Sequence, residues 1–255
     1  MYKIVITILV LSFSLTSIDA QADRYADSLF SAANAEYKQE SYHIAIDLYN
    51  EVVDTGYKSF ELFYNLGNAY YKSGIYPKAI LNYERALLIK PGDENAEFNL
   101  QKANAYTIDR IEMIPEFFLV TWFEGFISMF KSNVWAIISI LVFVLGLIMF
   151  LFYFISRSRQ TRVIGFSIGI ISVLIALFSF IFSVKTRNYI ENTDRGIVMS
   201  PTVTIKGAPD ENGVNVFIIH EGTKVRIIRS IGEWAEIRLA DGKQGWMLES
   251  EMEKI

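Results

Sequence analysis

The chain has 255 residues, no cysteine, and a formal net charge of −4 from 24 Lys and Arg against 28 Asp and Glu. The absence of cysteine excludes disulfide bonds, thiol catalysis and a lipid-modified cysteine anchor. Residues 23–114 hold 14 acids and 9 bases, and residues 185–255 hold 11 acids and 10 bases. Neither segment is basic enough for a nucleic-acid-binding surface, so we expect no nucleic-acid partner.

The first 22 residues have the organisation of a secretory signal peptide. Lys3 is followed by a short apolar stretch, Ile4 to Leu15, and by small residues around Ala20-Gln21-Ala22 that suit a cleavage site. Ile18-Asp19-Ala20 offers a competing and less tidy site, so an uncleaved anchor is the alternative. The chain is therefore expected to be exported.

An internal repeat begins after this segment. Residues 34–49 realign on residues 68–83 at an offset of 34, with identities at Asn34/Asn68, Ala35/Ala69, Tyr37/Tyr71, Lys38/Lys72, Tyr42/Tyr76, Ala45/Ala79, Ile46/Ile80 and Tyr49/Tyr83. Thirty-four residues is the period of the tetratricopeptide repeat, a pair of helices that stacks on its neighbours.

The second copy resembles that family closely, with Leu66-Gly67 and Tyr70 on the first helix, Ala79, Tyr83 and Ala86 on the second, and Pro91 at the end. The first copy is degraded, with Ala33, Glu36 and Tyr57 at three family positions. A third copy starts at Phe98-Asn99-Leu100 and Ala103 and then stops, which predicts a capping helix from about Glu94 to Met113. Residues 23–114 are thus expected to form an all-α tetratricopeptide solenoid.

The resemblance implies a groove lined by the first helix of each repeat, where this family binds peptides. The groove residues would be Phe30, Asn34, Tyr37, Lys38, Tyr64, Asn65, Asn68, Tyr71, Lys72 and Phe98. The carboxylate-clamp positions of the family fall on Phe30, Asn34, Asn65, Asn95 and Asn99, where its cations are absent. We therefore expect an extended or helical protein segment rather than a terminal carboxylate, the alternative being that the tyrosines merely pack between helices.

Residues 115–132 are rich in aromatic side chains and carry few charges. Because aromatic residues favour the lipid headgroup region, we expect an interfacial helix here. A re-entrant or partner-binding segment is the alternative.

Two charge-free apolar runs follow, Asn133 to Ile155 and Val163 to Val184, and each is long enough to cross a bilayer as a helix. The loop of residues 156–162 is too short to return across the membrane, so the flanking modules share a compartment. Arg157, Arg159 and Arg162 favour a cytoplasmic loop, but cations also flank the opposite helix ends. The orientation therefore rests on the signal peptide, which predicts an inner-membrane protein with periplasmic soluble modules.

After a linker over residues 185–195, the segment 196–255 alternates short apolar runs with glycine-containing turns, which predicts a small all-β module of five or so strands. Its turn at Gly222, its tryptophan strand at Trp234 and its Gly245-Trp246 pair resemble the bacterial SH3 family, which implies an SH3-like barrel. Trp234 falls on the more polar face and, with Trp246, could contact a ligand or instead close an end of the barrel. The sequence gives no reason to expect a proline-rich ligand.

No catalytic, cofactor or metal constellation is evident. His43 and His220 lie in separate modules outside any metal-ligand spacing, and no phosphate-binding glycine loop occurs. Glu249, Glu251 and Glu253 have the pattern of a solvated acidic tail. We therefore expect a protein that is not an enzyme and has no cofactor.

The order of these segments resembles the BatE family of the Bacteroides aerotolerance operon. That resemblance implies a non-enzymatic membrane scaffold working with von Willebrand factor A-type membrane proteins and, indirectly, a MoxR-type ATPase in oxidative or envelope stress. The alternative is a cell-wall module that binds peptidoglycan through its SH3-like domain and recruits a wall-processing enzyme.

Overall fold

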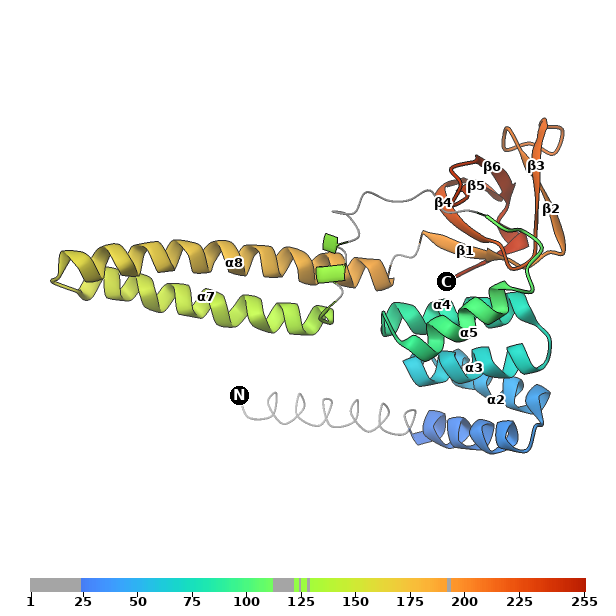
Figure 1. Ribbon diagram of the computed structural model, residues 1–255, viewed down its shortest axis with the longest axis horizontal. Coiled ribbons are helices and arrows are strands. Elements are labelled where there is room, and N and C mark those ends of the chain that lie inside the picture. The colour runs from blue at the N-terminus through green and yellow to red at the C-terminus, as the bar shows by residue number, and fades with distance from the viewer. Residues whose placement is uncertain (1–23, 112–121, 124, 128, 192–193) are drawn as a thin grey trace, which may run out of the picture. The chain divides into compact units, whose positions relative to one another are not determined.

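A computed structural model describes residues 24–111, 122–123, 125–127, 129–191 and 194–255 (Figure 1). The chain divides into two compact units, one made of residues 1–114 and 194–255 and the other of residues 115–193. The expected signal peptide and most of the expected interfacial segment lie outside the described residues. The broad architecture of a helical repeat region, two apolar helices and an antiparallel sheet is confirmed.

The repeat region consists of two successive helix pairs and a single further helix. The first pair is a helix over residues 24–38 and α2 (Tyr42–Asp54), the second is α3 (Phe60–Lys72) and α4 (Tyr76–Ile89), and α5 (Glu94–Asn104) follows. Within each pair the chain turns through a left-handed residue, Glu40 (φ 62°) and Gly74 (φ 77°). These two residues are 34 positions apart, so the backbone repeats with the sequence.

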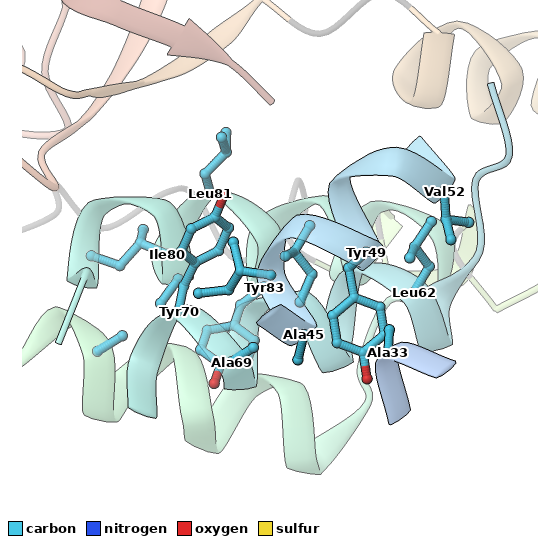
Figure 2. Packing of buried hydrophobic residues seen from close by; sticks show 14 of the residues in the cluster. Ala33, Ala45, Tyr49, Val52, Leu62, Ala69, Tyr70, Ile80, Leu81 and Tyr83 are labelled. Carbon is cyan, nitrogen blue, oxygen red and sulfur yellow. The ribbon is translucent and has the colours of Figure 1, made fainter. Parts of the chain in front are cut away.

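Tyrosines fill the core of the repeats, where small residues make room for them (Figure 2). Tyr49 and Tyr83 occupy equivalent positions on α2 and α4 and are both buried. A Cβ atom at Gly67 would lie 2.8 Å from the Tyr83 ring, so the glycine lets α3 approach this ring closely. The motif residues of the sequence therefore act here as packing residues.

The capping helix is shorter than predicted, because α5 ends at Asn104 and not at Met113. The Thr107 hydroxyl donates to the Asn104 carbonyl (2.8 Å), and Asp109 then accepts hydrogen bonds from His220 and Thr223 of the sheet. The chain is thus diverted from the helix axis by contacts with residues far away in sequence. Residues 112 and 113 lie outside the described residues.

Seven antiparallel strands make one sheet in the order β3-β2-β6-β5-β4-β1-β7. They are β1 (Arg195–Val198), β2 (Thr202–Lys206), β3 (Asn215–His220), β4 (Lys224–Ile231), β5 (Trp234–Arg238), β6 (Gln244–Leu248) and β7 (Met252–Lys254). Gly222, Gly232 and Gly242 adopt positive φ at three of the predicted turns. The sheet does not close into the expected SH3-like barrel, since the strand order has two ends. It has seven strands where about five were expected, because β1 pairs with β4 and adds β7 at the edge.

The acidic tail expected at the end of the chain is likewise wrong. Glu249–Glu251 forms a short 3₁₀ helix that leads into β7, and burial raises the pKa of the Glu251 carboxyl. Glu253 forms ion pairs with Lys78 and Arg85 of α4. Of the three acidic residues, Glu253 is therefore engaged by the repeats, while Glu249 contacts Ser230 and Lys254 of the sheet.

The second unit contains two long apolar helices, α7 (Ser132–Ile155) and α8 (Arg159–Glu191). Both are long and apolar enough to cross a membrane. The connection is residues 156–158, shorter than the seven residues expected, because the helical conformation of α8 begins at Arg159. A row of small buried residues on α8 packs against α7, namely Gly165, Gly169, Ser172, Ala176, Ser179 and Ser183.

Candidate partner-binding groove

The first helices of successive repeats lie side by side, and their equivalent residues form rows across them. Asn65 on α3 donates to Asn34 on the helix of residues 24–38, and Asn99 on α5 donates to Asn68 on α3, both at 2.9 Å. At the offset of 34, one row contains Phe30, Tyr64 and Phe98, and another contains Lys38 and Lys72. The predicted groove residues therefore come together on one set of adjacent helices.

The asparagines of the groove join helices together. The Asn34 side-chain oxygen accepts from the Tyr49 hydroxyl (2.6 Å) as well as from Asn65. The Asn68 oxygen accepts in the same way from Tyr83 (2.8 Å) and from Asn99. Because a buried amide without partners is costly, these bonds give the recurring asparagines a structural role. In the sequence, this structural role could have been inferred from the tyrosine that follows each asparagine by 15 residues.

The tyrosine hydroxyls in this network are fixed as donors. Burial, with the nearby Tyr37 ring, raises the pKa of Tyr49 to about 12. Burial raises the pKa of Tyr83 as well, further than that of Tyr49. Neither hydroxyl ionises near neutral pH, so the hydrogen bonds to the asparagines hold over the whole physiological range.

Most of the predicted aromatic groove residues pack against other rings. Phe30 contacts Tyr49 with ring centroids 5.8 Å apart, Tyr37 contacts Tyr42 at 5.4 Å, Tyr64 stacks on Phe60 at 5.6 Å, and Tyr71 contacts both Tyr76 and Tyr106. Tyr106, which also stacks on Tyr76 at 4.1 Å, escaped the sequence analysis because it lies beyond the recognisable motif. These ring contacts favour the alternative interpretation, in which the tyrosines pack between helices.

Three predicted groove residues remain open to a partner. Phe98 is 56% exposed, with the Lys102 ammonium 4.2 Å above its ring. Lys38 on the helix of residues 24–38 and Lys72 on α3 are also exposed. An aromatic ring and separated ammonium groups can contact a peptide through stacking and through charge. These exposed side chains, Lys38, Lys72, Phe98 and Lys102, lie on the first helices of successive repeats and are hereafter called the groove surface.

The two tryptophans of the sheet both lie on its outer face. Trp234 is half-buried opposite Leu248 of β6, and Trp246 is 5% exposed beneath the guanidinium of Arg229, which lies 5.2 Å from the ring. The sequence placed Trp234 on the more polar face, and the strand register agrees. Within residues 194–255, a direct contact of Trp246 with a ligand would require Arg229 to move.

The histidines differ in their surroundings. His43 is exposed on α2, whereas the His220 ring and its backbone N–H both contact Asp109. Burial opposes ionisation of the Asp109 carboxyl, but hydrogen bonds from Thr223 and His220 outweigh it and lower the Asp109 pKa. In the described part of the chain, no three His, Asp or Glu side chains gather as a metal site.

Comparison with known families agrees with the helix pairing. A family model for the tetratricopeptide repeat matches residues 60–93, which span α3, α4 and the turn after them. No curated protein matches the chain. Tetratricopeptide repeats are protein-interaction modules without catalytic chemistry of their own. The chain therefore contains a tetratricopeptide repeat.

Proposed function

We propose that the protein is a non-enzymatic scaffold anchored in a membrane, whose groove surface holds a segment of a protein partner. The observation that carries this proposal is the combination of a tetratricopeptide repeat with the exposed Phe98 and the exposed lysines of the groove surface. The asparagines and tyrosines of the predicted groove make contacts within the repeats. They hold the helices in register while the exposed side chains recognise the partner.

Contacts between the repeats and the sheet support placing both modules on one side of the membrane. Lys224 of β4 binds the Glu84 carboxylate at 2.7 Å, and Ile197 of β1 is fully buried in the cluster that contains the repeat core. Gly222 lies so close to Thr107 that a Cβ atom there would be 2.5 Å from a methyl group. The repeats precede residues 115–193 in the sequence and the sheet follows them. If both lie on one side of the bilayer, α7 and α8 cross it as a pair.

The packing of the two long helices supports membrane insertion. Small residues face the partner helix, while large apolar side chains such as Leu141, Ile171 and Phe180 point outward with about half or more of their surface exposed. Trp135 is buried against Phe126, Phe130 and Phe182, and its indole N–H donates to the Ile127 carbonyl at 2.9 Å. An aromatic cluster at the helix end suits the headgroup region, which supports an interfacial role for the segment before α7.

The finer assignment follows the family resemblance. With an exported amino terminus, the loop of residues 156–158 is cytoplasmic and the repeats and the sheet are periplasmic. The partners would be other membrane proteins of a cell-envelope complex, of the von Willebrand factor A type, acting with a MoxR-type ATPase in tolerance to oxidative stress as in the BatE family. The bilayer itself holds the two helices.

Affinity purification from membranes tests the scaffold function. Because Asn34 and Asn68 join helices, their replacement would confuse binding with folding, and the exposed residues are the better targets. A Phe98→Ser/Lys72→Glu variant is expected to lose a co-purifying membrane protein. The matched control is Ile44→Ser on α2, where an equally exposed apolar side chain (54%) is removed outside the groove surface. Identical partners in all three preparations would contradict the proposal.

A further inference from the structure

We propose that the outer face of the sheet over β4, β5 and β6 binds an extended, acidic segment of a protein partner. This face is the side of the sheet opposite the buried residues Val225, Ile237 and Met247. It carries three rows of side chains, each running across neighbouring strands. This site is separate from the groove surface, and the proposal does not depend on it.

The first row is a line of arginines. Arg195 of β1 lies directly opposite Arg226 of β4, which lies directly opposite Arg238 of β5, and the row ends at Gln244 of β6. Residues opposite each other in an antiparallel pair have Cβ atoms about 5 Å apart, and like charges there destabilise the sheet. The contact of Arg226 with Arg238 therefore works against folding, which favours a role of this pair in binding.

The arginine row is partly but not fully balanced. Arg226 binds the Asp194 carboxylate at 2.6 Å, and Arg195 lies 3.8 Å from the same side chain. With the Gln244 amide oriented so that both of its polar atoms are satisfied, its oxygen accepts from Arg238 at 2.7 Å, and this neutral partner does not compensate the charge of Arg238. A carboxylate laid between Arg226 and Arg238 would receive the paired N–H bonds that guanidinium groups make with planar anions.

The other two rows supply apolar and mixed contacts. The middle row contains Arg229, Glu236 and Trp246, with an ion pair of 2.6 Å between the first two. The last row contains Ile231, which is 50% exposed, with Trp234 and Leu248. Arg226 and Arg229 are paired with the carboxylates of Asp194 and Glu236, whereas Arg238 faces the neutral Gln244, so the face attracts negative charge at one end and apolar groups at the other.

The spacing of the rows defines the partner. Along β5 successive rows are two residues apart, so the arginine and apolar rows are separated there by about 13 Å at about 3.3 Å per residue, whereas a bulge in β4 places Arg229 three positions after Arg226. An extended peptide would span them with an apolar residue and a carboxylate four positions apart. A flat anionic membrane would instead bring negative charge against Glu236 in the middle row. The neighbouring row, Ile197 and Lys224, already contacts the repeats, so the proposed site continues an existing interface.

Fluorescence anisotropy tests this site in the full chain held in detergent. The probe is a labelled ten-residue peptide of serine and threonine with leucine at one position and glutamate four positions later. We expect saturable binding that weakens with added salt, and an Arg226→Gln/Arg238→Gln variant should bind at least about tenfold more weakly. Ile231→Ser should also weaken binding, and because this side chain is exposed, the substitution should leave the fold intact.

Two controls make the test specific. Arg24→Gln removes the same kind of charge from the repeats and should bind the peptide as the unaltered chain does. A permuted peptide, with leucine next to glutamate, should bind more weakly. The proposal is overturned if the two-arginine variant binds the peptide normally, if the peptide does not bind, or if phosphatidylglycerol vesicles or peptidoglycan fragments bind this face and the peptide does not. Loss of binding to a Phe98→Ser variant would also contradict it, because the groove surface would then be the site.

Discussion

The repeats and the helical hairpin both pack helices against helices, but they fill the space between them in opposite ways. In the repeats, large side chains such as Tyr49 and Tyr83 point inward and small residues make room for them. In the hairpin, α8 presents glycine, serine and alanine to α7 and turns its large side chains outward. The spacing of that small row alternates between four and three residues, as in a left-handed helix pair.

This difference is the one expected if the repeats fold in water and the hairpin lies in lipid, as proposed above. In water, burying large apolar side chains drives association, so the repeats bury theirs. In lipid that driving force is absent, and helices associate through close backbone approach and hydrogen bonds between small polar residues. The bonds from Ser139 to the Ala176 carbonyl (2.8 Å) and from Ser132 to the Ser183 carbonyl (2.9 Å) are of this kind. Four predictions test the comparison, beginning with the largest effect.

The repeats should depend most on their buried tyrosines. Tyr83→Ala removes a ring that is 1% exposed and should lower the free energy of unfolding by about 3–5 kcal/mol, the range for buried aromatic residues. Tyr83→Phe removes only the hydroxyl and should cost about 1 kcal/mol, since Asn68 keeps its bond from Asn99. Protease digestion in increasing urea measures both. Equal effects of the two changes would mean that packing of the ring contributes little.

The contact between the repeats and the sheet should depend on Asp109 and on pH. Asp109→Ala leaves the His220 N–H and the Thr223 hydroxyl without their acceptor, at a cost of about 1–3 kcal/mol. The folded pKa of Asp109 is lowered, so its contribution is complete above the unfolded value near 4 and is lost as the pH falls through the folded value. Urea unfolding at several pH values measures this. A variant whose acid sensitivity equals that of the unaltered chain would contradict it.

The hairpin should instead be sensitive to added bulk. A Cβ atom at Gly165 would lie 2.9 Å from the Met149 carbonyl oxygen, so Gly165→Leu must push the helices apart, at about 1–3 kcal/mol. Cysteines at Gly146 and Ser172, whose Cβ positions are 3.3 Å apart, report the separation through their rate of disulfide formation. Ile164→Leu on the outer face is the matched control. If Gly165→Leu left the rate of disulfide formation unchanged, the small residues of α8 would not be needed for close packing of the two helices.

The smallest effect concerns the arginine row. If Arg238 is kept for binding, Arg238→Gln relieves a like-charge contact with Arg226 and should raise the free energy of unfolding by about 0.2–1 kcal/mol. The same urea titration measures it, with Arg24→Gln as the comparison. A loss of stability would assign Arg238 a structural role.

The sequence was informative wherever a local pattern determines local structure. The 34-residue offset predicted both helix pairs, and the charge-free runs predicted α7 and α8 within a few residues at three of their four ends. Prediction from the sequence failed where segments distant in the chain contact each other. The Glu253 side chain was interpreted as solvated because its partners, Lys78 and Arg85, are more than 160 residues away. The open sheet was missed for the same reason, since the pairing of β1 with β7 joins the two ends of the module.

The groove shows the limit of reasoning from repeated residues alone. Asn34 and Asn68 recur because each receives two hydrogen bonds from neighbouring helices, and no one-dimensional pattern distinguishes that role from ligand binding. Phe98, in contrast, is exposed because no further repeat covers it among the described residues. The exposure of each side chain, which cannot be read from the sequence, was needed to distinguish residues that join helices from residues open to a ligand.

The most direct test of the central claim, that the repeats and the sheet share one side of a membrane, is site-specific labelling. Because the chain has no cysteine, Lys58→Cys, Ser156→Cys and Lys243→Cys each introduce a single thiol, in the repeats, the hairpin loop and the sheet respectively. In intact spheroplasts, an impermeant maleimide should label positions 58 and 243 and should reach position 156 only after the membrane is opened. Labelling of 58 and 243 from opposite sides, or of 156 together with both, would contradict the account.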